Sequence, residues 1–359
     1  GRIVVTYCEE GQWRLGCIDA SSGILAPVEI PYCDFMGLKV SGSAAYFVAG
    51  HISEPPLLVA LCLNDFNIEP IRRSTDATID PSQISAAQAV TFPTYGGEKA
   101  HGFYYPPANS DVVGPDGSLP PLIVKSHGGP TGQTGEALNL KIQYWTSRGF
   151  AVLDVNYRGS TGYGRAYREK LRGGWGVVDV DDCEAGALYL VSQGKADGNR
   201  LIISGGSAGG YTTLCSLTFR DTFKTGASHY GIGDLATLAA DTHKFESRYL
   251  DRLIGPWPEA EVLYRERSPN HFANQLDCPV VFFQGLDDKI VPPNQAETMV
   301  AALKAKGTPV AYCSFEGEGH GFRQAVNIKR ALEGELYFYG QIFGFTPADT
   351  IESVSIENL

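Results

Sequence analysis

The segment Gly205-Gly206-Ser207-Ala208-Gly209-Gly210 limits the fold of this chain more than any other feature. It follows the apolar run 201–204, which predicts a strand, and it precedes a stretch from about Tyr211 that predicts a helix. Glycines on both sides of Ser207 permit a tight turn, because side chains there would clash with the neighbouring strand and helix. A glycine-rich turn can also be a simple connection. The flanking strand and helix favour a nucleophile elbow, with the serine hydroxyl exposed above a sheet.

A serine nucleophile needs a base, and the base needs a carboxylate that orients it. Asp287 and Asp288 come soon after the apolar run 280–284. His320 follows the run 310–315 and stands between two glycines, which let a loop return over the sheet. The order serine, acid, histidine is the order that a nucleophile elbow requires, with each partner just after a later strand. A surface histidine is the alternative for His320, and the elbow alone does not choose between the two aspartates.

From about residue 81 strands and helices alternate, which predicts an α/β domain. The predicted strands are 88–93, 100–106, 122–126, 150–155, 201–204, 225–230, 280–284 and 310–315. The predicted helices are 136–148, 179–193, 209–219 and 294–306. Together with the elbow they predict an α/β-hydrolase fold: an eight-stranded, mostly parallel sheet with helices on both faces.

The first 80 residues contain short strands and turns with little helical periodicity. The stretch from Cys17 resembles the stretch from Cys62, at a spacing typical of four-stranded propeller blades. We therefore expect three regions: about two blades of a partial β-propeller at 1–80, the hydrolase domain at 81–345, and a polar C-terminal tail at 346–359.

Composition excludes several classes of function. The net charge of −11 argues against a nucleic-acid partner, and no apolar run reaches the length of about 18 residues needed to cross a bilayer. Eight scattered cysteines without a CxxC pair favour a reducing, cytoplasmic location and offer no zinc site. Asp179, Asp181 and Asp182 could suggest a metal, but acidic residues at a helix start are better explained by the helix dipole. We expect no metal and no nucleotide or flavin cofactor.

Several motifs in order resemble the prolyl oligopeptidase family of serine peptidases, closest to its acylaminoacyl-peptidase and dipeptidyl-peptidase-like branch. The matching stretches are His127-Gly128-Gly129-Pro130, residues 156–164, the elbow, residues 241–250 and residues 317–322. The resemblance implies hydrolysis of short peptides through an acyl-enzyme formed by Ser207, Asp288 and His320. Its Gly-x-x-Asp-x-x-Val-Pro pattern assigns the acid to Asp288, and Asp287 becomes a neighbour.

The oxyanion hole has one donor from the elbow and one from the resemblance. Elbow geometry supplies the backbone N–H of Ala208, and the resemblance implies the hydroxyl of Tyr163 as the second donor. Gly128 and Gly129 stand where lipases and esterases place oxyanion glycines, but the resemblance points to a structural loop there.

The position of four residues near the later strand ends suggests an apolar substrate pocket. They are Tyr230, Ile232, Leu235 and Val291. Residues 241–250 mix charged and aromatic side chains on what we expect to be a helical lid, whose role the sequence does not define.

The chain departs from the family in one respect, since only about 80 residues precede the hydrolase domain. It is expected to be either a fragment or a truncated relative with an open site. An incomplete propeller would expose strand edges that could pair with a second copy of the chain. Two other functions stay open: a carboxylesterase on the same fold, and a catalytically silent interaction module. The sequence does not distinguish an endopeptidase from an exopeptidase.

Overall fold

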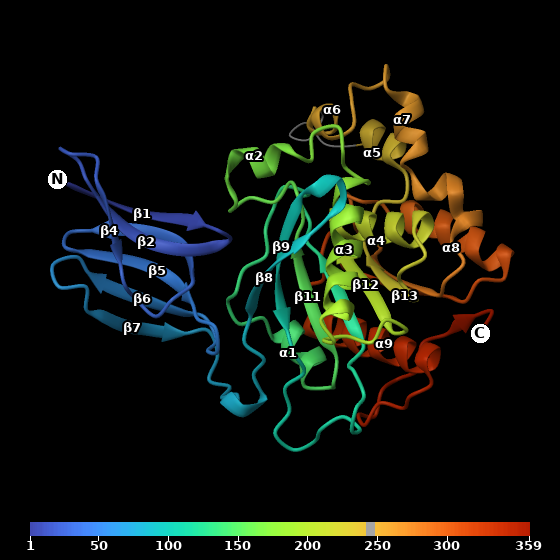
Figure 1. The fold of residues 1–359 in the computed structure, drawn as a ribbon, viewed down its shortest axis with the longest axis horizontal. Coiled ribbons are helices and arrows are strands. Elements are labelled where there is room, and N and C mark those ends of the chain that lie inside the picture. The colour runs from blue at the N-terminus through green and yellow to red at the C-terminus, as the bar shows by residue number, and fades with distance from the viewer. Residues whose placement is uncertain (242–247) are drawn as a thin grey trace.

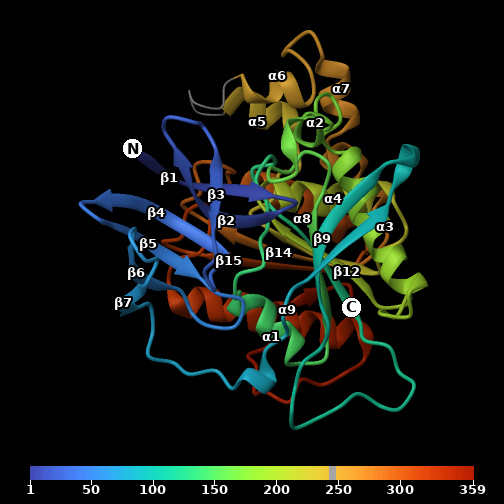
Figure 2. The ribbon, with the colours of Figure 1, turned by 60° about the vertical axis from the view of Figure 1, so that its left-hand side comes forward.

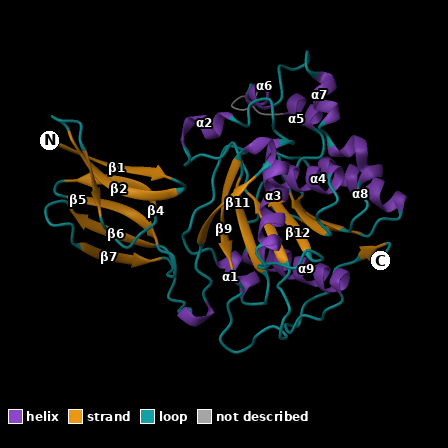
Figure 3. Cartoon of the chain, in the orientation of Figure 1, coloured by secondary structure: helices purple, strands orange, loops and turns teal. Residues whose placement is uncertain are grey.

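The computed structural model describes residues 1–241 and 248–359 and divides them into an all-β region and an α/β region (Figures 1 and 3). The all-β region carries β1–β7, and every strand pairing in it is antiparallel. The α/β region begins at β8 and holds the helices. Most of the expected lid at residues 241–250 lies outside the described residues.

Two small sheets make up the all-β region. One has the order β1-β2-β3, from β1 (Arg2–Glu9), β2 (Gln12–Asp19) and β3 (Leu25–Val28). The other has the order β4-β5-β6-β7, from β4 (Asp34–Ser41), β5 (Ala44–Gly50), β6 (Leu57–Cys62) and β7 (Ile68–Arg73). The sequence did not predict β3, β4 and β7, because most of their residues are exposed and show little apolar alternation. The two halves of the predicted repeat are the pairs β2–β3 and β6–β7, each in its own sheet.

The main sheet has nine strands in the order β16-β15-β14-β13-β12-β10-β11-β9-β8. The strands are β8 (Gln88–Pro93), β9 (Lys99–Tyr105), β10 (Leu122–Ser126), β11 (Ala151–Asn156), β12 (Leu201–Gly206), β13 (Thr225–His229), β14 (Val280–Gly285), β15 (Val310–Phe315) and β16 (Ile356–Glu357). All eight predicted strands are present. The six from β10 to β15 run parallel, and β8, β9 and β16 are antiparallel to their neighbours.

The ninth strand lies within the predicted polar C-terminal tail at 346–359. Ile356 and Glu357 pair with Ala311 and Val310 of β15, and Val354 is buried. Two strand residues are too few to give a periodic pattern, so the pairing depends on the exposed edge of β15.

Helices cover both faces of the main sheet. They are α1 (Leu140–Thr146), α2 (Gly164–Glu169), α3 (Val178–Ser192), α4 (Ala208–Phe219), α5 (Leu235–Asp241), α6 (Tyr249–Leu253), α7 (Glu261–Glu266), α8 (Asn294–Lys306) and α9 (Ala325–Phe343), with 3-10 turns at Pro81–Gln83, Tyr95–Gly97 and Pro269–Gln275. One core packs α3, α4 and α8 against the sheet, and the other packs α1 and α9 (Figure 2). The short helices α5, α6 and α7 group together beyond one end of the sheet (Figure 1).

Period-2 alternation sends successive side chains of the central strands into opposite cores. In β12, Leu201 and Ile203 join the core with α3, α4 and α8, whereas Ile202 joins the core with α1 and α9. Both faces are buried, so these strands appear in the sequence as continuous apolar runs. The carboxyl ends of the parallel strands therefore meet at one edge, where an α/β sheet places its ligands.

Among the described residues, no helix is both long and apolar enough to cross a membrane. In the same part of the chain, no cluster of three His, Cys, Asp or Glu side chains has the arrangement of a metal site.

Candidate active site

Ser207 occupies the turn between β12 and α4 with a positive φ of 58°. The neighbouring glycines are required sterically. A Cβ at Gly209 would lie 2.0 Å from the carbonyl oxygen of Ser126, and a Cβ at Gly205 would lie 2.4 Å from the carbonyl oxygen of Gly209. This close approach of backbone to backbone is what the elbow motif predicts.

His320 and Asp288 reach Ser207 from the ends of β15 and β14. Ser207 Oγ lies 2.8 Å from His320 Nε2, and His320 Nδ1 lies 2.8 Å from Asp288 Oδ2. Asp288 is buried, and its Oδ1 accepts hydrogen bonds from the backbone N–H groups of Ile290 and Val291, each at 2.9 Å. The carboxylate is therefore held in one orientation while its other oxygen faces the imidazole.

Asp287 takes no part in this line of hydrogen bonds. Its side chain is exposed, and its backbone N–H donates to the carbonyl oxygen of Glu318. The geometry therefore favours Asp288 over its neighbour as the partner of His320.

Glu318 holds the loop that carries His320, a role that the sequence analysis did not identify. Its carboxylate accepts hydrogen bonds from Asn327 Nδ2 and from the backbone N–H groups of Arg323 and Gln324, all at 2.9 Å. The hydrogen bond from Asn327, together with the two backbone donors, lowers the pKa of Glu318. The only signal in the sequence was an acidic residue between two glycines beside a candidate base.

Tyr163 is turned away from Ser207 and toward the N-terminal sheets. Its hydroxyl accepts from Asn156 Nδ2 at 3.3 Å, and its ring stacks on His101 at 4.2 Å. The carbonyl of Gly162 accepts from the N–H of Gly11 at 3.0 Å, and a Cβ at Gly11 would lie 2.3 Å from the Tyr163 hydroxyl. This arrangement contradicts the prediction of an oxyanion donor from Tyr163, because docking of the β1–β2 turn holds its loop at that position.

The glycine loop after β10 lies beside Ser207 instead. A Cβ built on Gly128 would be 3.6 Å from Ser207 Cβ, and Gly129 lines the same pocket as Ser207. The Gly128 carbonyl faces His127 Nδ1 at 2.9 Å. Since carbonyl and N–H point in opposite directions across a trans peptide, the N–H of Gly129 points away from the His127 ring.

A pocket of about 280 Å³ opens beside Ser207. Its wall is mostly apolar and comes from seven parts of the chain: Gly129, Pro130, Trp175, Ser207, Ala208, Ile232, Leu238, Tyr249, Leu250, Ile290, Val291 and His320. Of the four predicted pocket residues, Ile232 and Val291 line it. Leu235 is buried in the core, and Tyr230 packs its ring against His320 at 5.0 Å.

Three wall residues that the predicted pocket did not include come from segments far from the strand ends. Trp175 precedes α3, and Tyr249 and Leu250 begin α6. Tyr249 is fixed by a hydrogen bond of 2.8 Å between its hydroxyl and Thr131 Oγ1. Tyr249 and Leu250 belong to the expected lid at residues 241–250, whereas Trp175 gave no signal that separates a pocket wall from an ordinary core.

Comparison with known proteins identifies the family of this chain. A model of the prolyl oligopeptidase family matches residues 136–346, more than half of the chain. The chain belongs to the prolyl oligopeptidase family.

Relatives within the family are known as structures and as curated sequences. The structure of a puromycin-hydrolyzing peptidase of Mycobacterium tuberculosis is 45% identical, with a TM-score of 0.96, and the match covers 99% of this chain and 54% of that one. A crystal structure of puromycin hydrolase is 42% identical, with a TM-score of 0.93, over 97% of this chain and 53% of that one. Dipeptidyl aminopeptidase BIII of Pseudoxanthomonas mexicana is 35% identical over 215 residues, 58% of this chain and 31% of the relative. The chain thus spans about half the length of these solved relatives.

The carboxyl group of Asp179 is fully buried at the start of α3. It accepts from the N–H of Gly176 and from Thr212 Oγ1, both at 2.6 Å, and so ties the segment after Trp175 to helix α4. Asp181 pairs with Arg220, and Asp182 pairs with Arg158. These contacts, with Asp179 and Asp181 in the first turn of α3, give the acidic residues a structural role.

Burial raises the pKa of Asp179 to about 6 from its ordinary value of 3.8. The folded state therefore keeps a proton that the unfolded state releases between about pH 4 and 6, so this group makes stability fall as pH rises through that range. We expect Asp179→Asn, which keeps the shape and can still bond Gly176 and Thr212, to remove this loss. As the pH rises from 4 to 7, the free energy of unfolding of the wild type should fall relative to that of the variant by on the order of 3 kcal/mol.

Thermal or urea unfolding of both proteins across that pH range measures the difference. Asp197→Asn is the matched control, because Asp197 is on the surface and a backbone N–H from Asn199 lowers its pKa. An equal pH dependence in Asp179→Asn and the wild type would show that Asp179 is ionised in the folded protein.

Proposed function

We propose that this chain carries the catalytic part of a serine peptidase that cleaves short peptides through an acyl-enzyme. Ser207 attacks the carbonyl carbon, His320 takes its proton and passes it to the leaving amine, and Asp288 orients His320. Water then attacks the ester on Ser207, with His320 again as the base, and releases the acid. The observation that carries the proposal is the continuous hydrogen-bonded line from Ser207 Oγ to the buried carboxylate of Asp288.

Negative charge on the substrate oxygen would be met by two backbone donors, the N–H groups of Ala208 and Gly129. Ala208 begins α4, so its N–H has no partner within the helix. The N–H of Gly129 points away from His127 in a loop beside Ser207. A donor placed where charge develops is worth about a hundred- to thousandfold in rate.

The pocket supports a substrate class. A mostly apolar wall favours an uncharged, bulky side chain on the acyl side of the cleaved bond, because a charged group there would lose hydration without a partner. Two similar structures are named for puromycin hydrolysis. We therefore propose short peptides and aminoacyl amides with a bulky apolar residue at that position as substrates.

The test is turnover of a matched series of chromogenic anilides that differ in the residue before the cleaved bond. We expect kcat/KM for phenylalanine or leucine to exceed that for lysine or glutamate by about a hundredfold or more. Puromycin and the Ser207→Ala protein complete the series as a substrate and as a background control. Preference for a charged residue would contradict the substrate assignment and leave the triad untouched.

The carboxylesterase and the silent interaction module are distinguished by two further measurements. An esterase hydrolyses an ester but leaves the matched anilide intact. A silent module would fold without reacting with a fluorophosphonate probe, whereas we expect an adduct that peptide mass spectrometry maps to Ser207.

We also propose a reducing, cytoplasmic location, which the eight free thiols support.

A further inference from the structure

The hydroxyl of Tyr157 contacts both ends of the Gly128-Gly129 loop beside Ser207. Tyr157 follows β11, is fully buried, and stacks its ring on His127 with the centroids 4.3 Å apart. Its hydroxyl lies 2.8 Å from the carbonyl oxygen of Pro130 and 3.0 Å from that of His127. These two carbonyls belong to the residues before and after the Gly128-Gly129 pair, so the single hydroxyl proton is shared between acceptors at both ends of it.

His127 fixes the carbonyl between those ends. A carbonyl oxygen can only accept a hydrogen bond. The contact of 2.9 Å between Nδ1 and the Gly128 carbonyl therefore requires the ring proton to be on Nδ1, which donates. The hydroxyl of Ser160 lies 2.7 Å from Nε2 and 2.7 Å from the carbonyl oxygen of Tyr157, so these two acceptors share its one proton. Burial lowers the pKa of His127 to about 4, which agrees with a neutral ring.

Glycine has no side chain that would hold its own backbone in place, so two successive glycines need support from outside. The carbonyls of His127, Gly128 and Pro130 are each held by the side chain of Tyr157 or of His127. With the Gly128 carbonyl fixed, the direction of the Gly129 N–H is fixed too, because the peptide group is planar.

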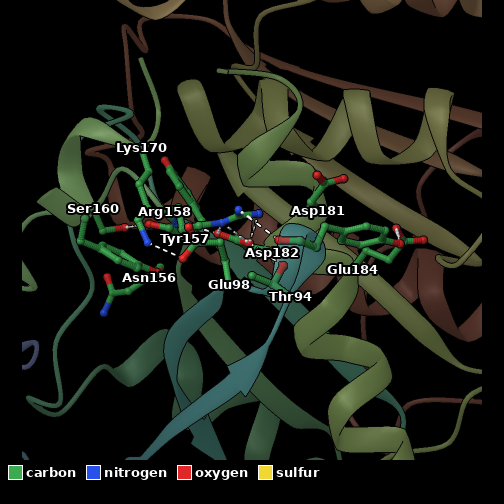
Figure 4. A network of polar contacts seen from close by, with 12 residues as sticks. Thr94, Glu98, Asn156, Tyr157, Arg158, Ser160, Lys170, Asp181, Asp182 and Glu184 are labelled. Carbon is green, nitrogen blue, oxygen red and sulfur yellow. Dashed lines mark hydrogen bonds and ion pairs between the residues drawn. The ribbon is translucent and has the colours of Figure 1, made fainter. Parts of the chain in front are cut away.

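The segment that carries Tyr157 is itself anchored (Figure 4). The backbone N–H and Nε of Arg158 donate to the Asp182 carboxylate of α3, at 2.6 and 2.9 Å. The N–H of Thr161 donates to the carbonyl of Gly132 at 3.0 Å. The segment of Tyr157 and Ser160 is therefore hydrogen-bonded both to helix α3 and to the loop after β10 that Tyr157 supports.

We propose that Tyr157 and His127 are positioning residues that aim the Gly129 N–H at the substrate oxygen. The inference rests on the proposed function, since it assigns the support of one oxyanion donor. Neither side chain lines the substrate pocket, so substrate binding in the ground state should change little. The loss should appear in kcat, because a misdirected donor weakens contacts made in the transition state.

The test is Tyr157→Phe, which removes the hydroxyl and keeps the stacked ring. We expect kcat on the best anilide to fall by about ten- to a hundredfold with KM within about twofold, less than the loss of a whole donor. Binding of a peptide aldehyde, whose adduct with Ser207 carries an oxyanion-like oxygen, should weaken by the same factor as kcat/KM. Tyr104→Phe is the control, since Tyr104 is also a buried tyrosine and its hydroxyl donates to a backbone carbonyl, that of Lys195.

A second variant separates positioning from folding. His127→Asn keeps a short side-chain donor toward the Gly128 carbonyl and should retain more activity than His127→Ala, while the two lose thermal stability alike. Three outcomes are distinct. An inactive wild type would overturn the proposed function. An active wild type with unchanged kcat in Tyr157→Phe would overturn this inference, as would equal falls in kcat in Tyr157→Phe and Tyr104→Phe.

Discussion

Ser207→Ala is expected to lower kcat/KM on a good anilide substrate by on the order of 10⁵- to 10⁶-fold. The alanine removes the only atom that can form the acyl-enzyme, and His320 then has no hydroxyl to activate. Reaction with a fluorophosphonate probe should be lost completely. The measurement is steady-state kinetics together with intact-protein mass spectrometry after labelling.

Ser216→Ala is the matched control for this variant. Ser216 lies on helix α4, which begins directly after Ser207; it is fully buried, and its hydroxyl donates to the carbonyl of Thr212 within that helix. We expect its kcat/KM to stay within a few-fold of the wild type. Ser207→Ala that still turns over the anilide with unchanged kcat would mean that another nucleophile does the chemistry.

Asp288→Asn should lower kcat/KM by on the order of 10⁴-fold, because an amide in this place favours the wrong tautomer of the neighbouring imidazole. The backbone donors of Ile290 and Val291 would still hold the side chain, so the fold should be retained. Asp287→Asn, one position away, changes the same chemical group where it is exposed and has no contact with His320. We expect that variant to stay within about threefold of the wild type, as surface positions usually do.

Measuring kcat/KM and the melting temperature of both aspartate variants decides which aspartate orients His320. Similar losses in both would point to a general effect of charge near the site. A larger loss in Asp287→Asn would reverse the assignment and would require a loop arrangement different from the one in which Glu318 accepts from the N–H of Asp287.

The sequence alone predicted the parts of this protein that local physics controls. Backbone crowding at Gly205 and Gly209 allows no side chain, so the glycines around Ser207 predicted the elbow from the sequence. Strands buried on both faces must be apolar throughout, and all eight predicted strands of the main sheet are present. Helices α3, α4 and α8 were predicted to within about a residue at each end.

Helix α9 was missed, although its buried face packs Leu336 and Tyr339 against the sheet, because no cap or glycine marked its start at Ala325. The strands β3, β4 and β7 and the short β16 were missed because their pairing depends on a neighbour's edge rather than on their own pattern. Packing between segments far apart in the chain leaves little trace in any one of them.

Only the tertiary structure decided how the site is completed. The elbow and the strand order did not choose between Asp287 and Asp288; the family resemblance assigned Asp288, and the path of the loop after β14 buries Asp288 and exposes Asp287. Tyr163 had a suitable hydroxyl, but docking of the turn at Gly11 holds it elsewhere. The glycine loop lies beside Ser207 because Tyr157 and His127 hold its carbonyls from outside. Residue types set which chemistry this chain can perform, whereas contacts between distant segments set which of those residues meet.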